Sequence, residues 1–146
     1  MQLFDSAALR GIFRLDIRRA DGSLIERIEE HNLIVNGAKN QLARLVAGDA
    51  AGRHITEIGF GTGTTAANPN DTTLISAYWK NVLSVSYPGI GQVAFTWSLA
   101  TAEANGKAIT EFGLRCADGT LFARKVRAPI HKSDDLSLNG TWTIVF

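Results

Sequence analysis

The sequence predicts an all-β protein, a mainly antiparallel β-sandwich of about eight strands with one short helix. Three observations lead to this prediction. Apolar and polar residues alternate with a period of two in most segments. Dipeptides suited to tight hairpin turns, Asp21-Gly22 and Asp118-Gly119, separate neighbouring segments. One stretch alone has helical spacing, and strands joined by short turns without alternating helices favour a sandwich over a parallel α/β sheet.

The first part of the chain predicts a β-hairpin. Apolar and charged residues alternate in residues 13–17, the Asp21-Gly22 turn follows, and a second strand covers residues 24–28. We treat residues 1–30 as an N-terminal arm and hairpin, a candidate element for attachment or for exchange between subunits. This element belongs to a single sandwich domain of residues 1–146, a length typical of one domain.

Residues 37–47 predict the helix. Leu42, Leu45 and Val46 recur at helical spacing, and Asn36 stands where it would cap the helix N-terminus. Gly48 follows the last apolar residue, where a helix often ends in a left-handed residue. A helix of this kind would lay its apolar stripe on a sheet and cover an otherwise open face.

Beyond the helix the β pattern resumes, interrupted by a polar loop at residues 61–73 that is rich in Gly, Pro, Asn, Asp and Thr. Trp97 and Trp142 occupy apolar positions of clean alternations, so both are predicted to be buried. The expected strands cover residues 55–60, 82–87 (with a start near Tyr78 as the alternative), 93–99, 109–116, 121–127 and 136–146.

Two of these strands share one pattern. Residues 55–60 and 109–114 both read apolar, Thr, Glu, apolar, Gly, apolar. We interpret them as similar strands that pair or occupy equivalent places, with glycine easing a bulge or a close approach. The alternative is that Glu57 and Glu111 form the carboxylate pair of a hydrolase, which needs a cleft and a separation of about 5–9.5 Å. Nothing in the sequence indicates a cleft, so we predict no catalytic residues and no enzyme.

No other motif predicts chemistry. The glycine-rich residues 59–65 lack the lysine and the following helix of a phosphate loop, so we interpret them as a strand leaving into a flexible loop. His31, His54 and His131 are too far apart for metal-ligand spacing, and we predict no metal and no cofactor. The lone Cys116 excludes an intramolecular disulfide and is predicted to be buried in a strand.

Three residues are candidates for contact with another molecule. Tyr78 and Trp79 follow the polar loop, and Phe146 completes the apolar alternation of the last strand. Because aromatic residues are enriched at interfaces, we predict that these three side chains contact another subunit or a glycan. Charge is balanced, with 15 Lys and Arg against 14 Asp and Glu, so no nucleic-acid partner is expected.

The hydropathy of the chain predicts a soluble protein made in the cytoplasm. No apolar run approaches the roughly 20 residues that span a bilayer, so no membrane insertion is expected. Residues 1–11 lack a basic region followed by an apolar core, so no secretory signal is expected there.

The order of segments resembles a group of small tail-fibre, baseplate and neck-appendage proteins of tailed bacteriophages. The resemblance covers roughly residues 30–146 and consists of structural residues rather than a catalytic motif. The segments that carry it are His31–Asn36, Ile55–Thr65, Pro69–Thr72, Ile109–Leu114, Leu121–Arg124 and Pro129–Phe146.

This resemblance implies a structural virion subunit that forms or decorates a tail fibre, a baseplate or a neck appendage. It implies several copies, most often a homotrimer, and other phage tail, baseplate or neck proteins as partners. The virion would then be its location after synthesis in the host cytoplasm. The alternative is a receptor- or carbohydrate-binding module at a fibre tip, with a host surface glycan as partner, which the polar loop near Tyr78 and Trp79 favours.

Overall fold

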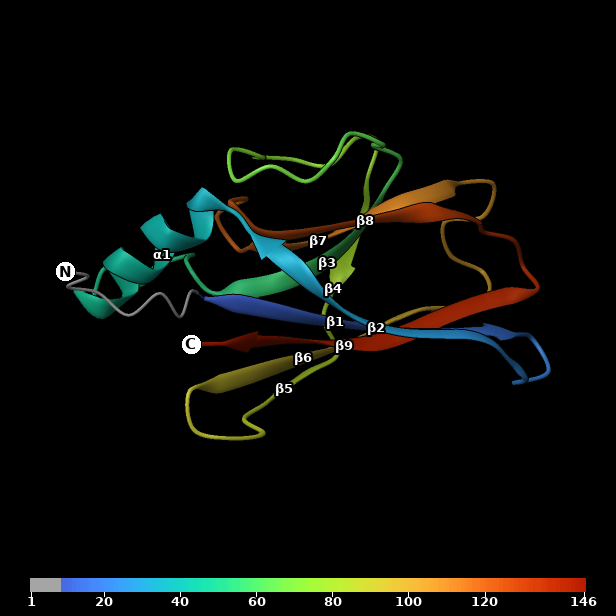
Figure 1. Ribbon diagram of the computed structural model, residues 1–146, viewed down its shortest axis with the longest axis horizontal. Helices are drawn as coiled ribbons and strands as arrows, with labels where there is room; N and C mark the ends of the chain where they lie inside the picture. The colour runs from blue at the N-terminus through green and yellow to red at the C-terminus, as the bar shows by residue number, and fades with distance from the viewer. Residues whose placement is uncertain (1–8) are drawn as a thin grey trace, which may run out of the picture.

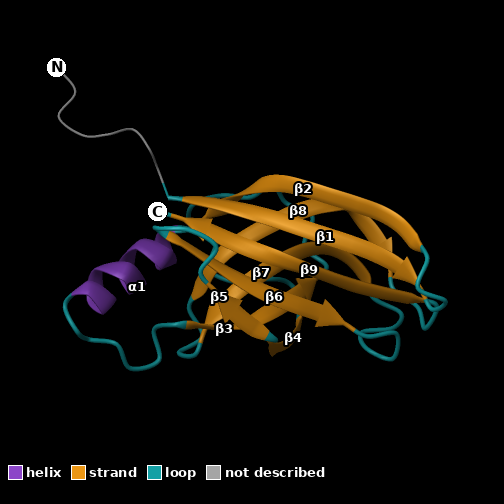
Figure 2. Cartoon of the chain, turned by 90° about the horizontal axis from the view of Figure 1, so that it is seen from below, coloured by secondary structure: helices purple, strands orange, loops and turns teal. Residues whose placement is uncertain are grey.

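The computed structural model describes residues 9–146, and this part of the chain folds into nine β-strands and one helix (Figure 1). The strands run along the length of the molecule, and the helix α1 lies at one end (Figure 2). The elements are β1 (Arg10–Arg19), β2 (Leu24–Ile34), α1 (Asn36–Val46), β3 (Ile55–Gly61), β4 (Tyr78–Asn81), β5 (Ser84–Ser86), β6 (Gln92–Leu99), β7 (Ala108–Cys116), β8 (Leu121–His131) and β9 (Leu136–Val145).

All strand pairs are antiparallel, and the strands form one curled sheet in the order β4-β3-β7-β8-β2-β1-β9-β6-β5. The sheet bends sharply at the long strand β2, which lies between β8 and β1. This strand pairs with β1 over most of its length but with β8 only through Leu33 and Ile34. The sheet therefore folds into two facing layers, which confirms the predicted all-β, antiparallel sandwich with one short helix.

The other side of the sandwich is linked by the segment that contains β4 and β5. The Val82 N–H donates to the carbonyl of Thr56 in β3, and the Leu83 N–H donates to the carbonyl of Thr96 in β6. One continuous piece of chain thus passes from one layer to the other. The strand predicted for residues 82–87 is observed as the shorter β5. The alternative start near Tyr78 corresponds to a separate strand, β4, because the backbone changes its pairing partner between Val82 and Leu83.

An aromatic cluster fills the space between the layers. The ring of Phe13 in β1 lies 4.8 Å from that of Phe112 in β7 and 4.8 Å from that of Trp142 in β9. Trp97 and Trp142 are fully buried, as predicted. The indole N–H of Trp142 donates to the side-chain oxygen of Asn32 at 2.8 Å, so its polar atom is satisfied inside the core.

The predicted turns are confirmed by their backbone geometry. Gly22 and Gly119 have φ angles of 90° and 91°, a conformation that glycine adopts without steric strain, and each lies in the turn of a predicted hairpin. The N-terminal hairpin is an integral part of the sandwich, because β1 lies between β2 and β9 in the sheet. Residues 1–8 of the proposed N-terminal arm lie outside the described residues.

The helix lies within one residue of its predicted bounds, but its predicted cap is wrong. Val35 precedes α1, and no side chain caps the helix N-terminus. Asn36 instead lies in the first turn, where its side-chain amide donates to Asn70 and its backbone N–H donates to the carbonyl of Pro69. The first turn of the helix is therefore hydrogen-bonded to the polar loop. After the helix C-terminus, Gly48 takes the expected left-handed conformation, with a φ of 86°.

Candidate functional site

The two strands with the shared pattern lie side by side. In the β3–β7 pair, Gly59 lies opposite Gly113, and Phe60 lies opposite Phe112. The interpretation of two similar, paired strands is therefore confirmed. The phenylalanines point into the core between the layers, while the glycines belong to the outer face of the same layer.

The glycines on this outer face make room for side chains that cover it. A Cβ atom on Gly59 would lie 2.5 Å from the ring of Trp79, and one on Gly113 would lie 3.0 Å from a methyl carbon of Leu74. Leu74 packs with Val35 in a second, smaller apolar cluster outside the main core. We call this the outer cluster; it contains Val35, Leu74 and Leu121, with Ala77 and Trp79 packed against it.

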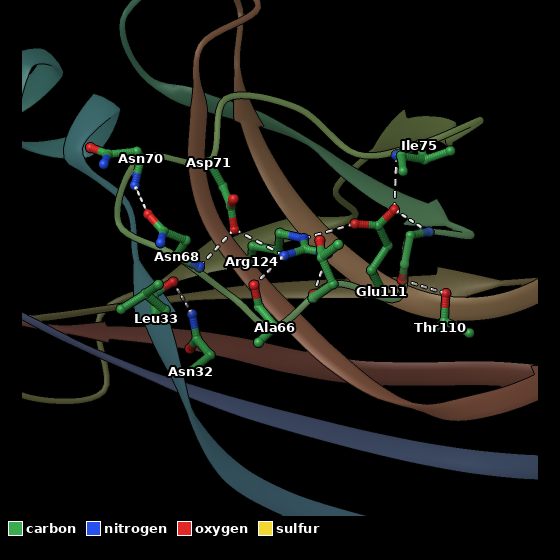
Figure 3. Close-up of polar contacts among 12 residues, drawn as sticks. Asn32, Leu33, Ala66, Asn68, Asn70, Asp71, Ile75, Thr110, Glu111 and Arg124 are labelled. Carbon is green, nitrogen blue, oxygen red and sulfur yellow. Dashed lines mark hydrogen bonds and ion pairs between the residues drawn. The ribbon is translucent and has the colours of Figure 1, made fainter.

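Leu74 belongs to the long connection between β3 and β4, residues 62–77, which we call the braced loop. A buried ion pair holds this loop on the outer face (Figure 3). The Arg124 Nε donates to Glu111 Oε1 at 2.8 Å, and both side chains are almost fully buried, with 3% and 1% of their surface exposed. The second oxygen of Glu111 accepts from the backbone N–H groups of Gly63 at 2.6 Å and Ile75 at 2.8 Å.

Arg124 and its neighbours hold the middle of the braced loop in the same way. The guanidinium of Arg124 donates to Asp71 Oδ2 at 2.9 Å and to the carbonyl of Thr65 at 3.0 Å. The hydroxyl of Thr110 donates to the carbonyl of Gly63 at 2.7 Å. A connection without regular secondary structure is thus fixed at several points by polar groups of β7 and β8, because buried polar groups must find partners.

This arrangement explains the glycine-rich sequence after β3. A Cβ atom on Gly61 or Gly63 would lie 2.6 Å or 2.4 Å from the Glu111 carboxylate, so both positions need glycine. The glycines make room for a carboxylate of the protein itself. The predicted change from strand to loop is correct, and the loop is held by partners that are distant in sequence.

The structure places Tyr78 and Trp79 on opposite faces of β4. Tyr78 pairs with Phe60, packs against the main core, and donates its hydroxyl to Glu103 Oε2 at 2.7 Å. Trp79 lies on the outer face, where the guanidinium carbon of Arg115 is 4.0 Å from its ring centroid. The two aromatic side chains therefore do not form one continuous surface.

The two glutamates of the shared pattern have separate roles. Glu57 lies opposite Arg115 and accepts two hydrogen bonds from its guanidinium, at 3.1 and 2.8 Å. Glu111 lies opposite Gly61, four residues further along β3, which corresponds to roughly 13 Å at the rise of a strand. Each carboxylate is thus engaged with its own arginine, Glu57 near the surface and Glu111 in the interior.

A polar hollow of about 440 Å³ opens where the braced loop meets the β6–β7 connection. Ser76 and Ala104, which have φ angles of 46° and 55°, are the non-glycine residues with positive φ in residues 9–146, and both line this hollow. Holding such residues in the left-handed region requires support from their surroundings. Lys107 supplies part of it by donating from Nζ to the carbonyl of Ser76. The lining residues are Thr62, Ser76, Ala104, Asn105, Gly106, Lys107 and Ala108.

Two charged residues organise the loops around this hollow. Burial alone would raise the pKa of Glu103, but hydrogen bonds from Lys80, the Ala100 N–H and Tyr78 outweigh it and lower the pKa to about 2. Lys132, with 2% of its surface exposed, donates to three oxygens that include the side chain of Asn105. Burial lowers the pKa of Lys132 from its ordinary value.

An apolar hollow lies at the other end of the sandwich, beside α1. It has a volume of about 550 Å³ and adjoins a smaller one of about 150 Å³ through the shared residues Leu42 and Phe146. Val46 is 90% exposed and Phe146 is 61% exposed on its wall. We call this the α1 hollow; it is lined by Leu9, Lys39, Leu42, Ala43, Val46 and Phe146.

Residues 9–146 present neither a metal site nor a membrane-spanning helix. Within residues 9–146, no group of three or more His, Cys, Asp and Glu side chains is placed to hold a metal ion. No helix in the same part of the chain is long and apolar enough to cross a membrane. Cys116 is fully buried in β7, as predicted. Comparison with family models, curated proteins and solved structures found no match to this chain.

Proposed function

We propose that this protein is a structural subunit of a tailed-bacteriophage virion that forms or decorates a tail fibre, a baseplate or a neck appendage. The observation that supports this proposal is where the resembling segments lie. Segments 55–65, 69–72, 109–114 and 121–124 all contribute residues to β3, the braced loop or the polar groups that hold the loop. The resembling segments thus form a sheet with a surface loop that buried polar groups hold in place. Such a fixed surface suits a subunit of a particle.

The partners of Glu57 and Glu111 favour a structural role over hydrolysis. Glu111 has Arg124 and two backbone N–H groups as partners, and Glu57 has Arg115. A general acid or nucleophile needs an oxygen open to substrate, and a buried carboxylate that already accepts three hydrogen bonds does not offer one.

The test is the composition of particles. Mass spectrometry of purified tailed particles from cells that carry this gene should detect the polypeptide at a fixed copy number. Immunogold electron microscopy with antibodies against the protein should label one position on the tail or neck. Purified particles that lack the polypeptide, while the cell lysate contains it, would contradict the proposal.

We further propose that the protein assembles as a homotrimer. The exposed apolar side chains support assembly, because large apolar groups in water often mark interfaces. Three alternate residues at the β5 edge, Leu83, Val85 and Tyr87, are 61%, 47% and 79% exposed. Light scattering on the purified protein should give three times the mass of the chain, and a monomer at micromolar concentration would contradict this.

The second candidate function is glycan binding at a fibre tip, and the polar hollow favours it. This hollow brings together hydroxyl, amide and ammonium groups of Thr62, Asn105 and Lys107, which suit the hydroxyl and carboxylate groups of acidic sugars. A glycan array should then show binding that Lys107→Met weakens. Lys39→Met, which removes a lysine at the α1 end, is the matched control and should bind like the parent protein.

A further inference from the structure

The α1 hollow is an apolar depression of about 550 Å³, and its position next to Leu9 suggests which segment covers it. Val46, Leu42 and Phe146 form a wall that faces water over much of its area. Leu9, the first described residue, lines the same hollow. Whatever precedes Leu9 in the chain therefore starts at the edge of an apolar surface that gains by being covered.

The residues before Leu9 have the composition that this hollow needs. Leu3 and Phe4 form an apolar pair, and Asp5-Ser6 follows with two residue types that favour turns. Phe4 precedes Leu9 by five residues, a separation that spans at most about 17 Å, so the chain is long enough for the pair to reach the hollow that Leu9 lines.

Charge at the rim agrees with this occupant. Lys39 is exposed on the wall of the hollow, and within residues 9–146 it makes no ion pair. Asp5 is the single carboxylate side chain among residues 1–8. An acidic residue next to the apolar pair complements the cation at the rim of an otherwise apolar surface.

We propose that the α1 hollow is the docking site of the N-terminal segment of the same chain, with Leu3 and Phe4 against Leu42, Val46 and Phe146. This inference is independent of the virion role. It also assigns a function to the exposed Phe146: its ring forms part of the wall on which the segment docks. Docking at this place accounts for the apolar side chains that the helix alone leaves in water.

Disulfide crosslinking tests this proposal on the full chain. The native thiol does not interfere, because Cys116 is fully buried and burial raises its pKa to about 11. The Phe4→Cys/Val46→Cys double variant, oxidised under mild conditions, should form an intramolecular disulfide. The matched control is Phe4→Cys/Leu24→Cys, since Leu24 is 44% exposed but follows the hairpin turn far from α1.

Peptide mass spectrometry should find at least a tenfold higher yield of the 4–46 disulfide than of the 4–24 disulfide. Equal yields would overturn the docking site. Mixing the two single variants, Phe4→Cys and Val46→Cys, tests the occupant. A 4–46 disulfide formed mainly between chains in this mixture would overturn the intramolecular assignment and make a neighbouring copy's segment the occupant.

A second measurement does not depend on disulfide geometry. The Leu3→Ser/Phe4→Ser variant should uncover the hollow and increase the fluorescence of the apolar dye ANS severalfold, with an unchanged far-ultraviolet circular dichroism spectrum. Leu24→Ser, which alters an exposed apolar residue at the opposite end, is the control and should not increase the signal. Equal dye binding by the parent and the Leu3→Ser/Phe4→Ser variant would overturn the proposal.

Discussion

The inner and outer faces of strands β3 and β7 bury their residues by different means. On the inner face, Phe60 and Phe112 pack into the aromatic cluster, 5.7 Å apart between ring centroids. On the outer face, Gly59 and Gly113 provide space instead of bulk, and Trp79 and the braced loop fill it. The same pair of strands therefore supports an apolar core on one side. On the other side lie the polar groups that hold the braced loop, Thr110, Glu111 and Arg124, which we call the bracing centre.

This difference suggests that the two faces have different roles: the inner face supplies most of the folding free energy, and the outer face fixes the position of the braced loop. The inner face buries large rings, and burial of that kind is the main source of folding free energy. The outer face buries one ion pair, which contributes little net stability but penalises any arrangement that leaves a charge unpaired. We therefore expect inner changes to weaken the whole fold and outer changes to affect the position of the braced loop as well.

The largest expected effect is on the inner face. Phe112→Ala should lower the free energy of unfolding by about 3–5 kcal/mol, as for other phenylalanine truncations in cores. The ring of Phe112 packs in tilted and edge-on contacts against Phe13, Phe60 and Trp97, so its loss leaves a cavity among large aromatic side chains. Guanidinium titration measures the change. Tyr87→Ala, at an aromatic residue that is 79% exposed, is the control, and an equal loss there would contradict the inner-core assignment.

The next effect sharpens the outer side of the comparison. Glu111→Gln should lower the free energy of unfolding by about 3 kcal/mol, the low end for breaking a buried ion pair, because Arg124 keeps Asp71 as a partner. The braced loop should also become sensitive to proteolysis, because a glutamine amide has one acceptor oxygen. Its NH2 group then faces either Arg124 or the N–H groups of Gly63 and Ile75, and all of these are donors.

Glu57→Gln is the matched control, because Glu57 occupies the equivalent position in the neighbouring strand. Its pair with Arg115 is about a quarter exposed, so the expected loss is about 0.2–1 kcal/mol. Urea titration and limited digestion with subtilisin make the comparison for both variants, because residues 62–77 contain no Lys or Arg and a protease of broad specificity is needed to cut there. Similar losses for the two variants, with no new cleavage in the braced loop of Glu111→Gln, would show that the buried pair does not hold the loop.

The inner face was predictable from sequence, whereas most of the outer face was not. Trp97 and Trp142 stand in alternations that any strand with one buried face shows, so their burial followed from a local pattern. Glu111 and Arg124 are the residue types that normally lie in water, and their burial depends on partners such as Asp71, which is 53 residues from Arg124. Contacts over such separations leave no period in the sequence.

For the candidate contact residues Tyr78 and Trp79, the sequence pattern predicts the side-chain directions only when the start of the strand is known. The opposite directions of Tyr78 and Trp79 follow from period two once β4 is known to begin at Tyr78. The start of that strand was uncertain because the polar loop precedes it, and the change of partner at Val82 depends on Thr56 and Thr96 in other strands. The resembling segments included most residues of the bracing centre, but not how they meet.

A smaller effect tests the space that the glycines provide. Gly59→Ala should lower the free energy of unfolding by about 1–3 kcal/mol, because the new methyl group displaces the Trp79 ring. Gly89→Ala, where the nearest side-chain atom lies at an ordinary 3.4 Å, should change it by about 0.5 kcal/mol or less. In the double variant Gly59→Ala/Trp79→Leu the losses should be less than additive, and full additivity would contradict a direct clash.

The smallest expected effect depends on pH and concerns Glu103, beside the polar hollow. Its pKa of about 2 lies below the ordinary 4.5, so its contribution to stability is fully present above pH 4.5 and is lost as the pH falls toward 2. With 23% of the side chain exposed, solvent screening leaves a contribution of about 1–2 kcal/mol at neutral pH. Glu103→Gln should therefore be less stable than the parent at pH 7, and the difference should shrink between pH 4.5 and 2 in urea titrations. Lys80→Met, which removes one donor to this carboxylate, should move that window to higher pH. A difference between Glu103→Gln and the parent that stays constant from pH 7 to pH 2.5 would show that the ionised carboxylate does not hold these loops.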